Sequence, residues 1–387
     1  MLQKIKKFIK KETVLSIAMV LAIVSMFIVP PDRGYISYID YRTLAILFCL
    51  MTIVACFRNM GVFDWFAQKM LLQVKSMAGI VTVLVMLSFF LSMLITNDVA
   101  LITFVPLAII VFQNVEKHIR NHWMMFCIVL QTVAANLGSM LTPIGNPQNL
   151  FLYGKAIETG KMRGIVDFIK LMLPYSILSL VMLLLCIVVM KCVFQNDIVD
   201  YDNNNFSVKK EQLEKKQKEY IFIYAFLFVV SFMAVAHKIH YLIPFFLVLV
   251  YTGARNRQIL KQVDYTLLAT FIALFIFIGN LGRIPQFRDG LSYFIDGRTM
   301  FTAVLASQVM SNVPAAVLLE KFTNDIPGLI VGTNLGGLGT LIASMASLIS
   351  FKYVAKEDSC MRGKYFLLFT SVNIAFLILM LCVWMVE

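Results

Sequence analysis

The sequence predicts an all-α polytopic membrane protein, and two observations lead to that fold class. The 387 residues are 60% hydrophobic and only 14% charged, whereas soluble domains are about 45–50% apolar and about 25% charged. Uninterrupted apolar stretches such as 171–190 and 365–386 reach the ~20 residues that a helix needs to cross a hydrocarbon core of ~30 Å. Together the apolar stretches predict about 11 transmembrane segments.

The basic residues indicate how the chain is threaded through the membrane. The net charge of +12 comes from Lys and Arg in short connections between apolar stretches, which is a topology signal rather than a nucleic-acid-binding surface. With a cytoplasmic N-terminus, 23 of the 34 Lys and Arg lie on cytoplasmic segments and 11 on the other side. No small-residue cleavage pattern follows the basic residues 1–12. We therefore predict a multi-pass protein of the cytoplasmic membrane with an uncleaved first span and an extracytoplasmic C-terminus.

Four short motifs recur in the same order in the two halves of the chain. DYRTLAILF from Asp40 matches DYTLLATFI from Asp264, and the motifs NMG, TNDVA and NLGSMLTPIGNPQN match NLG, SNVPA and NLGGLGTLIASMAS. The offset between partners falls from 224 to 221, 215 and 198 residues, as changes in loop length would produce. The charge bias makes each element of the second copy run opposite to its partner. This is the inverted-topology repeat of many secondary transporters.

Each repeat is expected to contain a re-entrant helical hairpin, which enters and leaves on one side of the membrane, followed by a broken helix. The predicted parts are a first repeat over 1–194 with hairpin 76–113 and broken helix 122–153, a cytoplasmic linker over 195–219, a connecting transmembrane helix over 220–238, and a second repeat over 239–387 with hairpin 299–321 and broken helix 326–350.

The breaks in the two broken helices are the strongest functional signal. The stretch LTPIGNPQN carries Pro143 and Pro147, which remove backbone donors and disfavour a continuous helix. An unsatisfied backbone group in lipid costs several kcal/mol, so irregular backbone persists only inside protein or against a water-filled cavity. The freed carbonyls, with the side chains of Thr142, Asn146 and Asn149, form a set of oxygen ligands suited to a small cation. The matching break contains three glycines, and its polar residues are Thr333, Asn334, Thr340 and Ser344.

The hairpin tips are expected to lie inside the protein as well. Each tip joins two apolar arms, and the second arm begins with free backbone N–H groups and a helix dipole that favour an anion. Thr96 and Asn97 at the first tip, and Ser311 and Asn312 at the second, provide polar groups there. Asp98 is an acidic residue well inside an apolar stretch, so a functional role is expected. It could coordinate a cation, carry a proton or cap the second arm.

Several other functions are disfavoured by the residues. The predicted binding layer contains no Lys or Arg, so an anionic substrate would need neutralisation by bound cations, helix N-termini and neutral donors. No Gly-rich, Lys-ending nucleotide-binding loop is present, and a lone buried aspartate is not the paired chemistry that an intramembrane enzyme needs. We predict no enzymatic activity, no cofactor, and no nucleotide or nucleic-acid partner.

The paired hairpin tips and paired breaks resemble those of the ion transporter superfamily. This superfamily contains the divalent anion:sodium symporters, the citrate transporters and the membrane subunit of the arsenite pump. The stretches ITNDVALITFVPLAI, TPIGNPQNLFLY and SNVPAAVLL look closest to bacterial permeases of the symporter type. The resemblance covers 13–386 and implies a homodimer in which a mobile transport domain carries substrate past a fixed scaffold, as an elevator does.

The resemblance also implies the site residues. By motif, a first Na⁺ site would comprise Thr96, Asn97 and the loop from Gly138 to Asn146, and a second would comprise Ser311, Asn312 and the loop from Gly336 to Thr340. The substrate-binding set would be Thr96, Asn97, Asp98, Ser311, Asn312, Thr142, Asn146 and Thr340. The sodium-coupled dicarboxylate branch has threonine at the third position of both tips, where this chain has Asp98 and Val313.

The expected function is secondary active transport of a small anion, with a di- or tricarboxylate or other organic anion favoured and Na⁺ or H⁺ as the coupling ion. The departures from the threonine pattern leave other branches open. The alternatives are transport of arsenite or another inorganic anion, and Na⁺/H⁺ antiport. An intramembrane enzyme is a remote alternative.

Overall fold

The computed structural model describes residues 12–74, 76–113, 117–193, 215–358 and 361–386, and every regular element among them is helical. The helices of the first half are α2 (Thr13–Ile28), α3 (Tyr35–Tyr38), α4 (Tyr41–Asn59), α5 (Val62–Leu71), α6 (Met77–Ile95), α7 (Asn97–Gln113), α8 (Lys117–Gly138), the short 3₁₀ helix η1 (Ser139–Leu141), α9 (Pro147–Glu158) and α10 (Ile165–Val193). Those of the second half are α11 (Lys215–Val235), α12 (Leu242–Arg255), α13 (Arg257–Leu260), α14 (Tyr265–Leu281), α15 (Pro285–Ile295), α16 (Thr299–Met310), α17 (Asn312–Glu320), α18 (Ile326–Leu335), α19 (Met345–Glu357) and α20 (Arg362–Val386).

The helix lengths agree with a polytopic membrane protein. In the described part of the chain six helices are long and apolar enough to cross a membrane: α4, α6, residues 122–141 of α8 and η1, α10, residues 218–235 of α11, and α20. A seventh span is possible if α14 and α15, which meet at an angle of 103°, count as one. The shorter apolar helices include α7, α16 and α18. The predicted all-α polytopic membrane fold is therefore confirmed.

Two matching helix starts show how local sequence sets the architecture. Asp40 precedes α4 and its Oδ1 accepts a hydrogen bond from the Thr43 amide at 2.9 Å. Asp264 precedes α14 and its Oδ1 accepts from the Leu267 amide at 3.0 Å. Each carboxylate satisfies one of the backbone donors that a helix start leaves free. The two Asp-Tyr motifs of the sequence thus begin two long helices in the same way.

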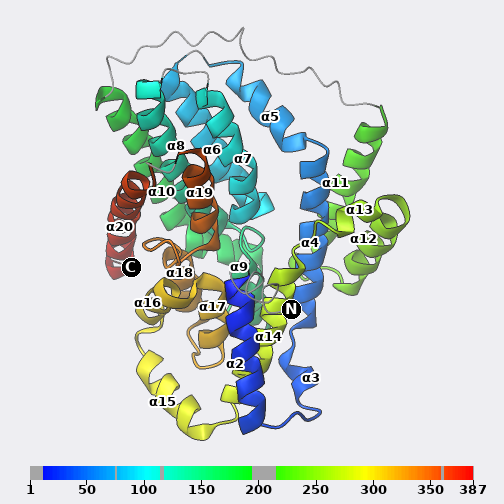
Figure 1. Ribbon diagram of the computed structural model, residues 1–387. Helices are drawn as coiled ribbons and strands as arrows, with labels where there is room; N and C mark the ends of the chain where they lie inside the picture. The colour runs from blue at the N-terminus through cyan, green and yellow to red at the C-terminus, as the bar shows by residue number, and fades with distance from the viewer. Residues whose placement is uncertain (1–11, 75, 114–116, 194–214, 359–360, 387) are drawn as a thin grey trace, which may run out of the picture.

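The hairpins and broken helices interlock at the centre of the molecule. Helices α6 and α7 pack against α8, and α16 and α17 pack against α18. Figure 1 draws the first group in the upper half of the molecule and the second in the lower half. Beyond each break the chain joins the other group, because α9 packs against α17 and α18 while α19 packs against α7 and α8. The two breaks therefore lie where the groups meet.

The apolar core has two parts. The larger one runs through the hairpins, both broken helices, α10, α14 and α20, with a contribution from α2. A smaller one lies where α4, α11, α12 and α13 pack together, around Cys49, Tyr224, Val248 and Ile259. Both hairpins and both broken helices thus belong to a single core.

The helix bounds can be set beside the predicted hairpins and the predicted connecting helix. The residues predicted as hairpins, 76–113 and 299–321, contain α6–α7 and α16–α17. The predicted linker over 195–219 lies outside the described residues as far as 214. From Lys215 onward the chain is helical, so α11 begins earlier than the predicted start of the connecting helix at Tyr220. The orientation of the repeats relative to a membrane stays a prediction.

Candidate functional site

Both hairpin tips have an unusual backbone conformation. Thr96, between α6 and α7, has φ 71° and ψ 148°, and Ser311, between α16 and α17, has φ 73° and ψ 157°. This region is almost restricted to glycine and costs about 1–3 kcal/mol for other residues. Non-glycine residues retained in such conformations cluster at functional sites. At both tips the residue in this conformation has a hydroxyl side chain.

Each tip is attached to the break that faces it. The backbone N–H of Asn97 donates to the Gly145 carbonyl at 3.3 Å, and the N–H of Asn312 donates to the Ala343 carbonyl at 3.1 Å. The two side-chain oxygens accept from the next backbone amide, that of Asp98 at 2.9 Å and that of Val313 at 3.0 Å. Both asparagines are buried. These hydrogen bonds of the two asparagines therefore hold the first turns of α7 and α17 in place next to the strained residues.

The break threonines form a second attachment. The Thr142 hydroxyl donates to the Met93 carbonyl, three residues before Thr96. The Thr340 hydroxyl donates to the Gln308 carbonyl at 3.2 Å, three residues before Ser311. Both predicted site threonines thus tie a break to the arm that leads into its hairpin tip.

Two asparagines join the breaks to one another in a crossed pattern. Asn136 Oδ1 accepts from the Ser344 hydroxyl at 3.0 Å, and Asn136 Nδ2 donates to Ser347 at 3.4 Å. Reciprocally, Asn334 Oδ1 accepts from Asn146 Nδ2 at 3.4 Å, and Asn334 Nδ2 donates to Asn149 Oδ1 at 2.7 Å. The end of α8 is thereby bound to the start of α19, and the end of α18 to the start of α9.

The first tip takes part in this network directly. Asn97 Nδ2 donates to Asn136 Oδ1 at 3.0 Å, on the same oxygen that accepts from Ser344. The first hairpin, the first broken helix and the second broken helix therefore meet at one buried amide. Such networks are costly to leave half-satisfied. A displacement of the first tip would therefore disturb hydrogen bonds at both breaks.

Glycines allow this close approach at the first break. A Cβ on Gly138 would lie 2.1 Å from the Phe89 carbonyl oxygen, and a Cβ on Gly145 would lie 2.0 Å from the Ser139 carbonyl oxygen. Both obstacles are backbone atoms, which cannot rotate away as a side chain can. Gly138 thus permits contact between α8 and α6, and Gly145 permits the loop to fold back on η1.

The two breaks differ in what their oxygens do. At the first break Asn146 is 3% exposed, and among the described residues its Oδ1 has no hydrogen-bond partner. The Ser139 and Thr142 carbonyls of this break lie 3.5 and 3.4 Å from Asn149 Nδ2, whereas at the second break the Gly336 and Leu338 carbonyls accept from Gln308 Nε2 at 2.9 and 2.8 Å. The unpartnered acceptor at the first break fits a ligand that supplies positive charge or a donor. Asp98, half-buried in the first turn of α7, lies at the same tip.

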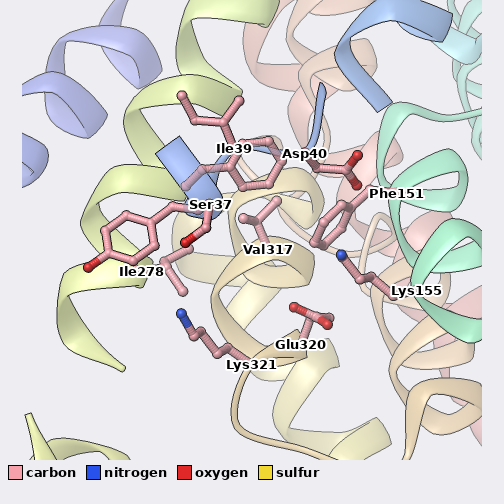
Figure 2. A pocket seen from close by; sticks show the side chains of 12 residues that line it. Ser37, Ile39, Asp40, Phe151, Lys155, Ile278, Val317, Glu320 and Lys321 are labelled. Atoms are coloured by element: carbon pink, nitrogen blue, oxygen red, sulfur yellow. The ribbon is translucent and has the colours of Figure 1, made fainter. Parts of the chain in front are cut away.

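A separate charged cavity of ≈ 260 Å³ lies between α9, α14 and α17. Its lining comes from the segment before α4, from α9, from α14 and from the end of α17. Figure 2 shows the charged ends of Lys155, Glu320 and Lys321 turned toward one open space, with Asp40 at its edge. None of the predicted site residues lines this cavity. The lysines are thus at the far ends of α9 and α17, and the tips themselves carry neutral donors and Asp98.

The structure brings most of the predicted residues together and adds others. Thr96, Asn97, Thr142, Gly145 and Asn146 surround the first tip, and Ser311, Asn312, Gly336 and Thr340 surround the second. The sequence prediction did not include Asn136 or Gln308, and it counted Asn334 only among the polar residues of the second break. The signal for the two asparagines was present, because they occupy the same place in the NLG motifs at the 198-residue offset. Gln308 carries no comparable motif.

Comparison with known proteins gives a consistent result. The family described as citrate transporter matches residues 4–324. An uncharacterized transporter of Methanocaldococcus jannaschii is 34% identical over 325 residues, 81% of this chain and 81% of the relative. The inner membrane protein YbiR of Escherichia coli is 29% identical over 334 residues, covering 85% and 84%. A Dictyostelium discoideum protein named as a transporter, arsB, is 25% identical over 190 residues, covering 49% and 31%. With its all-helical fold and its interlocked breaks, this chain belongs to the citrate transporter family of membrane transporters.

Proposed function

We propose that this protein is a secondary active transporter of a small anion, a di- or tricarboxylate or a related organic anion, coupled to Na⁺ or H⁺. The observation that carries the proposal is the pair of hairpin tips, each strained at a hydroxyl residue and each bonded to a helix break. Continuous helices would satisfy their own backbone at lower cost, so the interruptions need a function. The bacterial relative named as an inner membrane protein supports a location in the cytoplasmic membrane.

The tips supply the groups that an anion requires. α7 and α17 begin at the tips, and helix N-termini carry a partial positive charge. The backbone N–H groups of Asn97, Asp98, Asn312 and Val313 already donate within the protein, so the donors offered to an anion would be side-chain hydroxyls and amides. Asn97 and Asn312 orient the first turn of each helix through their side-chain oxygens. A carboxylate placed between the two tips would meet neutral donors from both hairpins. Selectivity would then come from the spacing of those donors rather than from a cationic side chain.

The first break supplies the groups that a coupling cation requires. Thr96, Asn97 and Asn146 offer amide and hydroxyl oxygens, with backbone carbonyls of the Gly138–Asn146 loop nearby. Oxygen ligands of this kind suit hard cations. The buried Asn146 Oδ1, which has no partner among the described residues, matches such a role. A cation there would offset the charge of Asp98 and of an anionic substrate together.

Alternating access would follow from the interlocked arrangement. Because each broken helix is bonded to the other, the hairpins and breaks would move as one unit past the group formed by α4, α11 and α12. This group has a small apolar cluster of its own, while one side of α4 and the end of α11 pack into the large core. Such a movement of one unit past another would be an elevator motion. Loading of cation and substrate would neutralise the site before it moves through the apolar interior.

A second candidate function is transport of arsenite or another inorganic anion, or Na⁺/H⁺ antiport. The observation that favours it is Asp98, which is half-buried at the first tip and has Val313 as its counterpart at the second. A carboxylate in this position can exchange a proton, which a threonine cannot. The Dictyostelium discoideum relative carries the arsB name.

The decisive experiment is a ligand screen on the purified full-length protein, followed by uptake in proteoliposomes. Apparent melting temperatures are measured with citrate, succinate, sulfate and arsenite, each with Na⁺ and with choline. A ligand at ~100 times its Kd stabilises by ~2.7 kcal/mol. We expect a carboxylate to raise the melting temperature more in Na⁺ than in choline, and to be taken up when a gradient is imposed. Stabilisation by arsenite or sulfate alone would favour inorganic anion transport. A flat screen with no anion uptake would contradict anion transport of either kind and would direct the test to Na⁺/H⁺ exchange in the same proteoliposomes.

Asp98→Asn separates a charged role of Asp98 from a capping role. Two unit charges ~4 Å apart at an effective dielectric of ~20 interact by ~4 kcal/mol, so a carboxylate that contacts the cation would contribute up to about a thousandfold in cation affinity. Uptake is measured against Na⁺ concentration and against pH. We expect the half-saturating Na⁺ concentration to rise or the pH dependence to disappear while the melting temperature changes little. Unchanged profiles would leave Asp98 as a helix cap only.

A further inference from the structure

Gln308 fills the second break with its own side chain. Its Nε2 donates to the Gly336 carbonyl at 2.9 Å and to the Leu338 carbonyl at 2.8 Å. Its Oε1 accepts from the Thr340 amide at 2.9 Å. Three backbone groups that the interruption of the helix leaves free are thereby satisfied by one carboxamide. These include the carbonyl of Gly336 and the backbone of Thr340, two residues expected to hold the second cation.

The backbone of the break is shaped around this carboxamide. Gly339 has φ +106°, and a Cβ on it would lie 2.4 Å from Gln308 Oε1. Its conformation favours glycine, and a side chain at this position would push the Gln308 carboxamide out of its place. The Thr340 hydroxyl also donates to the Gln308 carbonyl at 3.2 Å. Gln308 is thus fixed in the second break by hydrogen bonds to both its side chain and its backbone carbonyl.

The first break has no such donor at the matching place. The residue three positions before Thr96 is Met93, whose carbonyl accepts from Thr142 as the Gln308 carbonyl accepts from Thr340. A thioether is only a weak acceptor and donates no hydrogen bond. The first break also holds the buried, unpartnered Asn146 Oδ1. Both breaks have a side-chain amide near their carbonyls, but the distances differ. Asn149 Nδ2 lies 3.5 and 3.4 Å from the Ser139 and Thr142 carbonyl oxygens, at the long limit of a hydrogen bond, whereas Gln308 Nε2 lies 2.9 and 2.8 Å from its two carbonyls.

We propose that the carboxamide of Gln308 takes the place of a cation at the second break, so that this transporter binds its coupling cation at the first break alone. This inference rests on the proposed function. An amide N–H₂ group offers two donors to two carbonyl oxygens, as a bound cation offers positive charge to them, but it stays with the protein through the cycle. Each transported substrate would then be accompanied by fewer cations than two occupied sites would bring.

The test counts Na⁺ bound to the purified full-length protein by equilibrium dialysis against radioactive sodium, with choline as the balancing ion. Gln308→Glu is nearly the same size, cannot donate to the two carbonyls when ionised, and attracts a cation. We expect one Na⁺ per wild-type chain, none in Asn97→Ala and two in Gln308→Glu. Gln73→Glu, at an exposed position, is the matched control and should bind one.

Gln308→Met, which places the residue of the first hairpin in the second, covers the case in which the glutamate variant does not fold. It should also gain one Na⁺, and its melting temperature should rise more with Na⁺ than that of the wild type. Two Na⁺ on the wild-type chain, or no gain in a folded Gln308 variant, would overturn the inference. No Na⁺ on the wild type but one on the variants would support this inference while contradicting Na⁺ coupling at the first break.

Discussion

Asn97→Ala and Asn312→Ala are each expected to abolish transport while the protein remains folded. Asn97 makes three hydrogen bonds at the first tip: its backbone to Gly145, its side-chain oxygen to the Asp98 amide, and its side-chain nitrogen to Asn136. Alanine keeps the first and removes the other two. A buried group left without its partner costs about 1–3 kcal/mol, so losing both should disfavour the transport-competent site by about 2 kcal/mol or more and lower the uptake rate by at least about 30-fold.

Uptake into proteoliposomes of the substrate found in the screen gives the measurement. Asn324→Ala is the matched control, because Asn324 is exposed on the connection between α17 and α18, and it should transport at the wild-type rate. Size-exclusion elution and melting temperature report folding. If both tip variants transport normally, the tips do not bind the transported ions, and the site assignment is wrong.

Gly145→Ala is expected to have the largest effect on stability. The new Cβ would meet the Ser139 carbonyl oxygen at 2.0 Å, which is far inside van der Waals contact and involves backbone on both sides. Either η1 or the 142–146 loop must move, and the Gly145 carbonyl that receives the Asn97 N–H moves with it. Overpacking of a tight site typically costs about 1–3 kcal/mol, and a backbone obstacle places this substitution at or above the upper end.

The apparent melting temperature in detergent and the uptake rate should therefore both fall in Gly145→Ala. Gly253→Ala in α12 is the control, since nothing lies within 4 Å of its added Cβ. There the change should be neutral or should stabilise by up to ~1 kcal/mol, because alanine is the better helix former. Equal behaviour of the two variants would show that the 142–146 loop is more adaptable than its packing indicates.

Much of the fold could be predicted because the thickness of the bilayer sets the length of the apolar segments in the sequence. The helix-breaking residues Pro143 and Pro147 stand out against an apolar background, and the structure has its break there, between η1 and α9. The tip residues Thr96 and Ser311 were expected from the same contrast, and both have the strained conformation of an interrupted helix. The inverted arrangement of the two repeats and the cation sites remain predictions.

The sequence by itself determined the class of the protein, the positions of the tips and breaks, and the match between the two halves, because these follow from local hydropathy and from the few residues that interrupt a helix. The tertiary structure alone decided which side chains form hydrogen bonds with the backbone groups that the helix breaks leave free. Asn136 reaches Ser344 across 208 residues of chain, and Gln308 reaches the carbonyls of a different helix. Hydrogen bonds form between atoms about 3 Å apart in space whatever their separation along the chain. No local pattern could therefore have shown that the Gln308 amide lies on two carbonyls of the second break, or that Asn146 Oδ1 at the first break has no partner among the described residues.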